Sequence, residues 1–199
     1  VAVNSINDSA VISAPVVDLT ETNAVLSTGG TLTISDVDSP TTFTSLTNVA
    51  GTVGYGTFTV GTDGVWSYVA DTAHNEFEDG VVYTDSIEVT SADGTTSTIT
   101  VNITGTNDAP VISVGSGSVV ENTQPSIGGT LTATDIDNPA LAFTAGTTSG
   151  AYGSLVLAAG GGWTYTLDAR AEALAVGQVV SDAITVTLSY GSTTTVTLS

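Results

Sequence analysis

Paired acids recur at two places in the chain, residues 36–38 and 135–137, and both have the form Asp-x-Asp. In an extended strand, positions i and i+2 share one face about 7 Å apart, so each pair would present two carboxylates while Val37 and Ile136 turn inward. Close carboxylates repel unless a cation lies between them, and hard oxygen ligands favour Ca²⁺. The pattern indicates a divalent-cation site at each pair. A single such motif would also fit a solvated strand end before a Pro turn.

The acidic pairs belong to a repeat that covers the whole chain. Three further motifs return about 100 residues later: Gly29-Gly30-Thr31-Leu32-Thr33 as Gly128-Gly129-Thr130-Leu131-Thr132, Trp66-Ser67-Tyr68 as Trp163-Thr164-Tyr165, and the hinge Asn7-Asp8 as Asn107-Asp108. This period predicts two domains, residues 1–106 and 107–199. Residues 1–6 align with residues 101–106 and are expected to match the tail of a preceding repeat.

Composition restricts the partners that the chain can take. Its 199 residues carry 20 acids against one basic residue, Arg170, which gives a net charge of −19. Such a surface repels nucleic acid and anionic membranes and attracts cations. There is no cysteine, which excludes disulfides and thiolate metal sites. Because small extracellular domains commonly use disulfides or metals as staples, the absence of the first favours the second.

The alternation of apolar and polar residues predicts strands throughout. Runs such as 57–60, 66–69 and 98–103 alternate with period two and are separated by Gly and Pro turn signals. This spacing predicts an all-β fold of two tandem Greek-key β-sandwich domains, with about seven strands each. Residues 169–177 have helical composition and predict one or two helical turns, whereas the counterpart 72–80 is expected to be a loop.

Other chemistry is less well supported. An EF-hand loop beginning at Asp36 would need Gly at its sixth and Glu at its twelfth position, where the chain has Thr41 and Thr47.

His74 is the only histidine and has no counterpart in the second repeat, so catalysis is not expected. The repeated Trp-x-Tyr motifs fit the core better than a sugar-stacking face. Two further repeated acid pairs are expected to cap turns or face solvent: Asp71 with Asp168, and Asp85 with Asp182.

The ordered set of motifs resembles the VCBS or bacterial cadherin-like repeat. The resemblance rests on Gly-Thr-Leu-x-x-x-Asp-x-Asp at 30–38, on 55–58, on 63–68 and on Ile-Thr-Gly-Thr-Asn-Asp-Ala-Pro at 103–110. Such repeats form extender regions of large RTX-type bacterial surface adhesins, often exported by type I secretion. The resemblance implies cadherin- or immunoglobulin-like sandwiches with calcium at the junctions between them.

The resemblance also implies a set of metal ligands. The junction between the two repeats would use Glu21, Asn107, Asp108, Asp135 and Asp137. The N-terminal junction would use Asn7, Asp8, Asp36, Asp38 and Asp93. Tyr190 stands where Asp93 has its counterpart, so fewer ions or weaker binding is expected at the inner junction.

The expected function is therefore a calcium-binding spacer of a bacterial cell-surface adhesin, extracellular, monomeric and not an enzyme. Its expected partners are neighbouring repeats of the same chain, with surface glycans or proteins bound through other domains, and neither nucleic acid nor membrane insertion. Two alternatives stay open: an adhesive module that binds glycans or proteins through exposed aromatics and loops, and an accessory domain of a secreted hydrolase.

Overall fold

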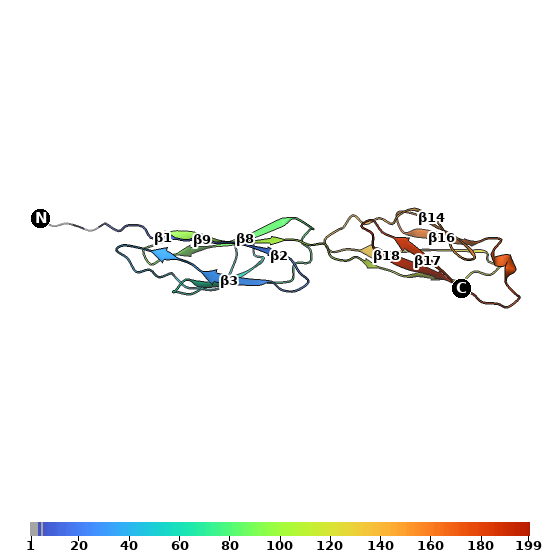
Figure 1. Ribbon diagram of the computed structural model, residues 1–199, viewed down its shortest axis with the longest axis horizontal. Helices are drawn as coiled ribbons and strands as arrows, with labels where there is room; N and C mark the ends of the chain where they lie inside the picture. Colours follow the sequence, from blue (N-terminus) through green and yellow to red (C-terminus); the bar gives the residue numbers. More distant parts are fainter. Residues whose placement is uncertain (1–3, 5) are drawn as a thin grey trace. The chain divides into compact units, whose positions relative to one another are not determined.

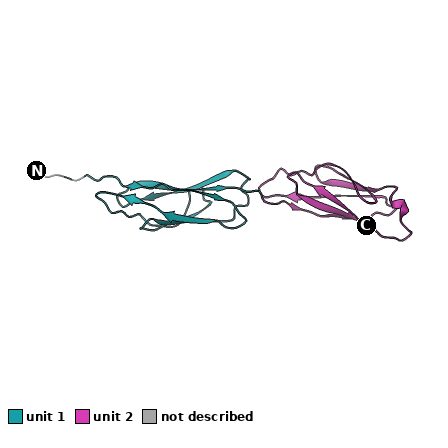
Figure 2. Ribbon diagram, viewed as in Figure 1, with its two compact units in different colours: residues 1–107 teal, residues 108–199 magenta. Residues whose placement is uncertain are grey.

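The computed structural model describes residue 4 and residues 6–199, which form two compact units, Val1–Asn107 and Asp108–Ser199 (Figure 2). The sequence placed the boundary one residue earlier, after Thr106. The expected match of residues 1–6 to a preceding repeat falls mostly on residues 1–3 and 5, which lie outside the described residues.

Unit 1 contains a three-stranded sheet in the order β2-β9-β8, a four-stranded sheet in the order β3-β7-β6-β5 and a short pair β1-β4. Strand β2 runs parallel to β9, and the other pairs are antiparallel. The strands are β1 Val11–Ile12, β2 Val16–Thr20, β3 Ser27–Thr31, β4 Ile34–Ser35, β5 Leu46–Ala50, β6 Gly56–Val60, β7 Val65–Ala70, β8 Val82–Thr90 and β9 Thr96–Thr104 (Figure 1).

Unit 2 repeats this arrangement, with sheets β11-β18-β17 and β12-β16-β15-β14 and the pair β10-β13. Its elements are β10 Val111–Ile112, β11 Gly115–Gly117, β12 Ser126–Thr130, β13 Ala133–Thr134, β14 Gly146–Ser149, β15 Gly153–Leu157, β16 Gly162–Leu167, the 3₁₀ helix η1 Ala171–Ala173, β17 Asp182–Thr187 and β18 Thr193–Leu198. In each unit the two larger sheets together contain seven strands, the number expected from the sequence. The all-β sandwich prediction is confirmed.

Each unit has its own core, built from the inward positions of the alternating strands. Along β7, Trp66 and Tyr68 are buried while Val65 and Val69 are exposed. Such alternation is the sequence signature of a strand with one face in the core. The predicted helical turn is present as η1, and residues 72–80 form turns without a helix, as expected.

The repeated Gly-Gly motif makes room for the core tryptophan of each unit. A Cβ atom on Gly29 would lie 2.5 Å from the Trp66 carbonyl oxygen, and one on Gly129 would lie 2.7 Å from Cζ2 of Trp163. These distances are shorter than any ordinary carbon contact. Glycine therefore lets the backbone of β3 approach the Trp66 backbone and the backbone of β12 approach the Trp163 indole.

Candidate metal centre

The first acidic motif lies in a turn and not in a strand. Strand β4 ends at Ser35, and Oδ1 of Asp36 accepts hydrogen bonds from the amides of Asp38, at 2.9 Å, and Ser39, at 2.8 Å. The prediction that Val37 turns inward is wrong, because this side chain is 83% exposed. Asp side chains compete with strand pairing by capturing nearby backbone amides, and this competition ends β4.

Hydrogen bonds also set the charge state of this turn. The amide of Asp38, followed by that of Ser39, holds the pKa of Asp36 below its usual value. The other carboxylate oxygen of Asp36, Oδ2, is buried and has no hydrogen-bond partner among the described residues. Asp36 is therefore an anion with one oxygen still available.

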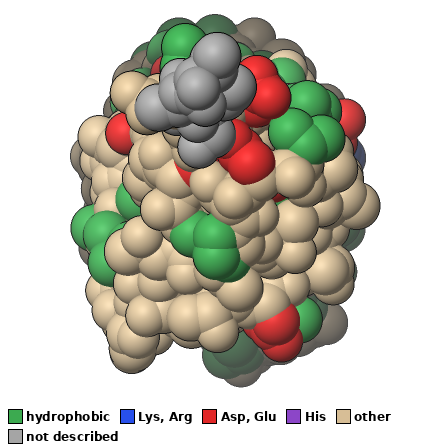
Figure 3. All heavy atoms as spheres, turned by 90° about the vertical axis from the view of Figure 1, so that its left-hand side faces the viewer, with side chains coloured by type: hydrophobic (Ala, Val, Ile, Leu, Met, Phe, Trp, Pro, Cys, Tyr) green, Lys and Arg blue, Asp and Glu red, His purple; other side chains and the backbone are tan. Residues whose placement is uncertain are grey.

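The five residues predicted for the N-terminal site meet in unit 1. The amide of Asp8 donates to Oδ2 of Asp38 at 3.2 Å, and Nδ2 of Asn7 lies 3.4 Å from Oδ2 of Asp93. The Ser39 hydroxyl donates to Oδ1 of Asn7 at 2.8 Å. Figure 3 shows Asp and Glu side chains gathered on the upper part of the end-on view. The turn after β4, the chain before β1 and the turn after β8 together form this cluster.

Asp93 differs from the rest because donors occupy both of its oxygens. Ser91 Oγ and the Thr95 amide, at 3.0 Å, donate to Oδ1, while Thr95 Oγ1, at 2.7 Å, and the Ala10 amide, at 3.0 Å, donate to Oδ2. The Ser91 hydroxyl first, and then Thr95, lower the pKa of Asp93 well below its usual value. In this structure Asp93 holds the β8–β9 turn.

The second acidic motif has different electrostatics. Oδ1 of Asp135 accepts longer bonds from the amides of Asp137, at 3.4 Å, and Asn138, at 3.3 Å. The Asp137 carboxyl raises the pKa of Asp135, first through a hydrogen bond between the two groups and then, with burial, through charge repulsion. The inward orientation predicted for Ile136 is wrong, because its side chain is 60% exposed.

Asp137 itself is buried, with 2% of its surface exposed. Its Oδ2 accepts the Asp108 amide at 3.2 Å, while Oδ1 has no partner in the part of the chain that the structure describes. A buried carboxylate oxygen without a donor destabilises the fold unless a proton or a cation compensates it. At the 135–137 pair this compensation would come from a proton shared between the two carboxyls or from a cation.

Glu21 also has a buried carboxylate oxygen without a hydrogen-bond partner, like Asp36 and Asp137. It follows β2, is 1% exposed, and accepts the Thr106 hydroxyl on Oε2, whereas Oε1 finds no partner within the described residues. Asp108 is also buried and Asn107 is exposed.

Across residue 4 and residues 6–199, no three Asp, Glu, His or Cys side chains lie close enough together to hold a metal ion. The candidate sets therefore depend on amide and backbone oxygens in addition to the carboxylates.

The aromatic motifs lie in the cores and not on a binding face. Trp66 is 4% and Trp163 5% exposed, and Tyr68 and Tyr165 are buried beside them. The core interpretation is confirmed, and sugar stacking on these four rings is excluded because no ring face is accessible.

The sequence did not predict that His74 is buried and that both of its ring nitrogens face acceptors. It is 6% exposed, stacks on Phe77 with ring centroids 4.5 Å apart, and both ring nitrogens face acceptors. Nδ1 lies 2.8 Å from Oε1 of Glu76, and Nε2 lies 2.7 Å from the Tyr55 carbonyl and 2.9 Å from Oδ1 of Asp71. The one available signal was its neighbour Glu76, because Tyr55 is distant in sequence.

The remaining repeated acids hold loops, as expected of capping residues. The Asp182 carboxylate accepts the amides of Ala151, at 2.9 Å, and Tyr152, at 3.0 Å, and the Tyr165 hydroxyl at 2.7 Å. Asp168 pairs with Arg170 at 2.6 Å. These acids are structural.

Comparison with known proteins identifies the family of the second unit. Residues 107–199 match the family model of the bacterial cadherin-like domain. The second unit is a bacterial cadherin-like domain. The first unit has the same strand order in each of its sheets. No curated protein matches the chain at the threshold applied.

Cadherin ectodomains are among the solved structures to which the chain is similar, and one of them, with a TM-score above 0.5, supports the fold. EC1-4 of PcdhgB3 matches with a TM-score of 0.53 and 17% identity, over 95% of this chain and 48% of that one. Drosophila N-cadherin EC1-4 matches with a TM-score of 0.36 and 17% identity, over 97% of this chain and 51% of that one. The human desmocollin-1 ectodomain matches with a TM-score of 0.39 and 16% identity, over 98% and 37%. The chain thus spans about half the length of the first two.

The match of residues 107–199 to the bacterial cadherin-like domain suggests an extracellular structural or adhesive module. Among the described residues there is no helix of the length and apolarity needed to cross a membrane.

Proposed function

We propose that the chain is a calcium-binding spacer of a bacterial cell-surface adhesin, in which Ca²⁺ at the ends of the cadherin-like repeats stiffens the array. The proposal rests on predicted ligands whose buried carboxylate oxygens have no partner in the described chain: Oε1 of Glu21, Oδ2 of Asp36 and Oδ1 of Asp137. Oδ2 of Asp85, which is not a predicted ligand, is in the same condition. Each of the three predicted ligands would gain an electrostatic partner from a hard cation.

Net charge supports a metal that binds through oxygen. With one basic residue against 20 acids, the chain has almost no cation of its own to neutralise these carboxylates. Its single arginine is already paired with Asp168. Ca²⁺ accepts carboxylate, amide and backbone carbonyl oxygens in flexible geometry, which matches the mixed donor set of Asn7, Asp8 and Asn107 beside the acids.

The mechanism is mechanical. Ca²⁺ bound by residues of the Asn-Asp hinge and of the adjoining repeats would replace repulsion between acidic ends with a shared ion, and a flexible joint would become rigid. Binding would also stabilise the folded state by about 2.7 kcal/mol at a hundredfold excess over the dissociation constant. In an adhesin, a rigid array holds a terminal binding domain away from the cell surface.

The test combines titration calorimetry with small-angle scattering of the intact chain in Ca²⁺ and in chelator. We expect saturable uptake, a higher melting temperature and a longer maximum dimension with Ca²⁺. Asp135→Asn with Asp137→Asn should abolish part of the uptake. Glu88→Gln, at an exposed site on β8, is the matched control for loss of negative charge and should leave uptake unchanged. Absence of heat and of any dimensional change at millimolar Ca²⁺ would remove the proposal.

A further inference from the structure

The only two side chains that can carry a positive charge lie at nearly equivalent places in the two units. His74 is the single histidine and Arg170 the single arginine, and the chain has no lysine. Both follow the strand that carries the core tryptophan of their unit, and each pairs with the repeated acid after that strand: His74 with Asp71 at 2.9 Å, and Arg170 with Asp168 at 2.6 Å. A chain with 20 acids thus uses both of its cationic side chains at one point of the repeat.

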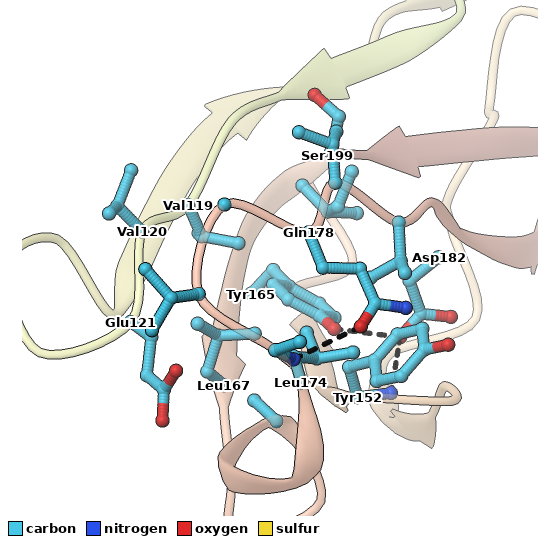
Figure 4. A pocket seen from close by; sticks show the side chains of 17 residues that line it. Val119, Val120, Glu121, Tyr152, Tyr165, Leu167, Leu174, Gln178, Asp182 and Ser199 are labelled. Carbon is cyan, nitrogen blue, oxygen red and sulfur yellow. Dashed lines mark hydrogen bonds between the residues drawn. The ribbon is translucent and has the colours of Figure 1, made fainter.

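In unit 2 this point adjoins the turn between β14 and β15, residues 150–152. The amides of Ala151 and Tyr152 donate to the Asp182 carboxylate at 2.9 and 3.0 Å. Asp182 also accepts the Tyr165 hydroxyl at 2.7 Å, and Figure 4 shows Asp182 together with the two tyrosines. A buried anion therefore holds the amide groups of the turn.

The cation of unit 2 holds carbonyl groups of the same turn. Nη1 of Arg170 donates to the Gly150 carbonyl at 2.6 Å, and Nη2 donates to the Gly153 carbonyl at 2.9 Å. Asp168 fixes the guanidinium by accepting Nε at 2.9 Å and Nη2 at 2.6 Å. An anion and a cation therefore clamp this turn together.

Unit 1 has the same arrangement with histidine in place of arginine. The turn between β5 and β6, residues 51–55, donates the Val53 amide to Oδ1 of the buried Asp85 at 3.1 Å. The Tyr55 carbonyl oxygen of this turn lies 2.7 Å from Nε2 of His74. The protonated histidine is therefore the cationic half of the clamp in unit 1.

The complete clamp needs a proton on both ring nitrogens of His74. Nε2 faces the Tyr55 carbonyl and Asp71, and Nδ1 lies 2.8 Å from Oε1 of Glu76. These two acids belong to the segment of the histidine itself, and the β5–β6 turn has no charged residue. A neutral ring has one N–H, so either Glu76 or the turn loses its donor. If the turn keeps its donor, the Thr72 hydroxyl, 3.3 Å away, can donate to Nδ1, but the bond to Tyr55 is no longer charge-assisted and is roughly half as strong.

We propose that His74 is a pH-sensitive clamp on the β5–β6 turn, closed while the ring is an imidazolium, and that Arg170 makes the clamp of unit 2 insensitive to pH. Arginine stays charged throughout this range. Burial lowers the pKa of His74, but its two carboxylate neighbours and the Tyr55 carbonyl raise it more, so the net shift is upward. The clamp is therefore complete below the unfolded pKa of about 6.5 and loosens as pH rises through the folded value. None of its residues is a proposed metal ligand, so the inference is independent of calcium binding.

Hydrogen exchange of the intact chain, in chelator and between about pH 5 and pH 8, tests the proposal. The reporters are the hydrogen-bonded amides of Thr52, Val53 and Phe77 in unit 1 and of Ala151 and Tyr152 in unit 2. After correction for the intrinsic pH dependence of exchange, we expect protection in unit 1 to fall about fivefold, the difference between a charge-assisted and a neutral hydrogen bond. This fall should follow the titration of the histidine ring, which NMR measures directly. Protection in unit 2 should stay constant.

Two variants serve as matched controls. Ala73→Arg with His74→Ala gives unit 1 the Arg-Ala pair that unit 2 has at residues 170–171, and protection of its turn should no longer change with pH. His74→Gln is neutral at every pH, so its protection should stay constant and match that of the wild type at high pH. Constant protection in the wild type across the titration of the ring would overturn the proposal. An equal fall in unit 2, or in either variant, would overturn it as well.

Discussion

Replacing Asp137 by Asn should change the stability of unit 2 in opposite directions with and without calcium. In chelator the wild-type unit carries a buried carboxylate with one oxygen unpaired and a neighbour, Asp135, whose pKa is raised by it. A buried unpaired polar group costs about 1–3 kcal/mol, more for a charge. Asn keeps an oxygen for the Asp108 amide and removes the charge. We therefore expect Asp137→Asn to raise the free energy of unfolding of metal-free unit 2 by about 1 kcal/mol.

In saturating Ca²⁺ the same substitution removes a proposed ligand, and the sign should reverse. The loss would approach about 2.7 kcal/mol if the wild type is at a hundredfold excess over its dissociation constant and the variant binds no ion. Asp38→Asn is the matched control, because Asp38 occupies the same motif position but is exposed. In chelator it should change stability by less than about 0.5 kcal/mol.

Chemical denaturation of the two variants and the wild type, in chelator and in millimolar Ca²⁺, measures all of these quantities. A destabilising effect of Asp137→Asn in both conditions would refute the reasoning, because it would show that the carboxylate is satisfied without a cation. In chelator, an effect of equal size for Asp38→Asn would refute the role assigned to burial.

Two further changes probe the framework of the units. Burial lowers the pKa of His74, but the Glu76 carboxylate and a backbone carbonyl raise it more, so the net shift is upward. The imidazolium therefore stabilises unit 1 fully below the unfolded pKa of about 6.5 and loses this effect as pH rises through the folded value. Melting of unit 1 between pH 6 and pH 8 should fall more steeply than in His74→Gln, and parallel curves would contradict this. Gly129→Ala places a Cβ atom 2.7 Å from the Trp163 ring and should destabilise unit 2 by about 1–3 kcal/mol in urea denaturation. Gly146→Ala meets no described atom within 4 Å and is the control.

Strand periodicity made the sandwich predictable. The alternation around Trp66 and Trp163 placed these rings in the cores, and a period near 100 residues indicated two similar units. The alternation rule gave a wrong prediction at the first Asp-x-Asp motif, where a side chain accepts hydrogen bonds from backbone amides. Asp36 captures two amides and ends β4, so its motif forms a turn and Val37 faces solvent. Ser39 and Pro40 after the motif were the signal for this turn.

Long-range contacts account for the other omissions. His74 is buried by partners such as Tyr55, which no local pattern connects to it. The two Asp-x-Asp pairs were predicted from residue type and recurrence, and the other candidate ligands from the family resemblance. The difference in burial between Asp38 and Asp137 follows from the tertiary structure alone.

The replacement of Asp93 by Tyr190 affects a turn as well as a candidate ligand, and the expected weaker cation binding stays a prediction. Both oxygens of Asp93 already accept hydrogen bonds from Ser91, Thr95 and Ala10, so its counterpart in unit 2 would not have offered a free ligand. Tyr190 is 67% exposed and has a φ of 66°, a left-handed conformation that is uncommon for a bulky residue. Asp93 holds the equivalent turn in unit 1, so we expect Tyr190 to leave the β17–β18 turn without that support. Cation affinity in unit 2 should depend on the buried Asp137 and its repulsion with Asp135, which together favour an added cation more strongly than the unit 1 pair, where Asp38 is exposed.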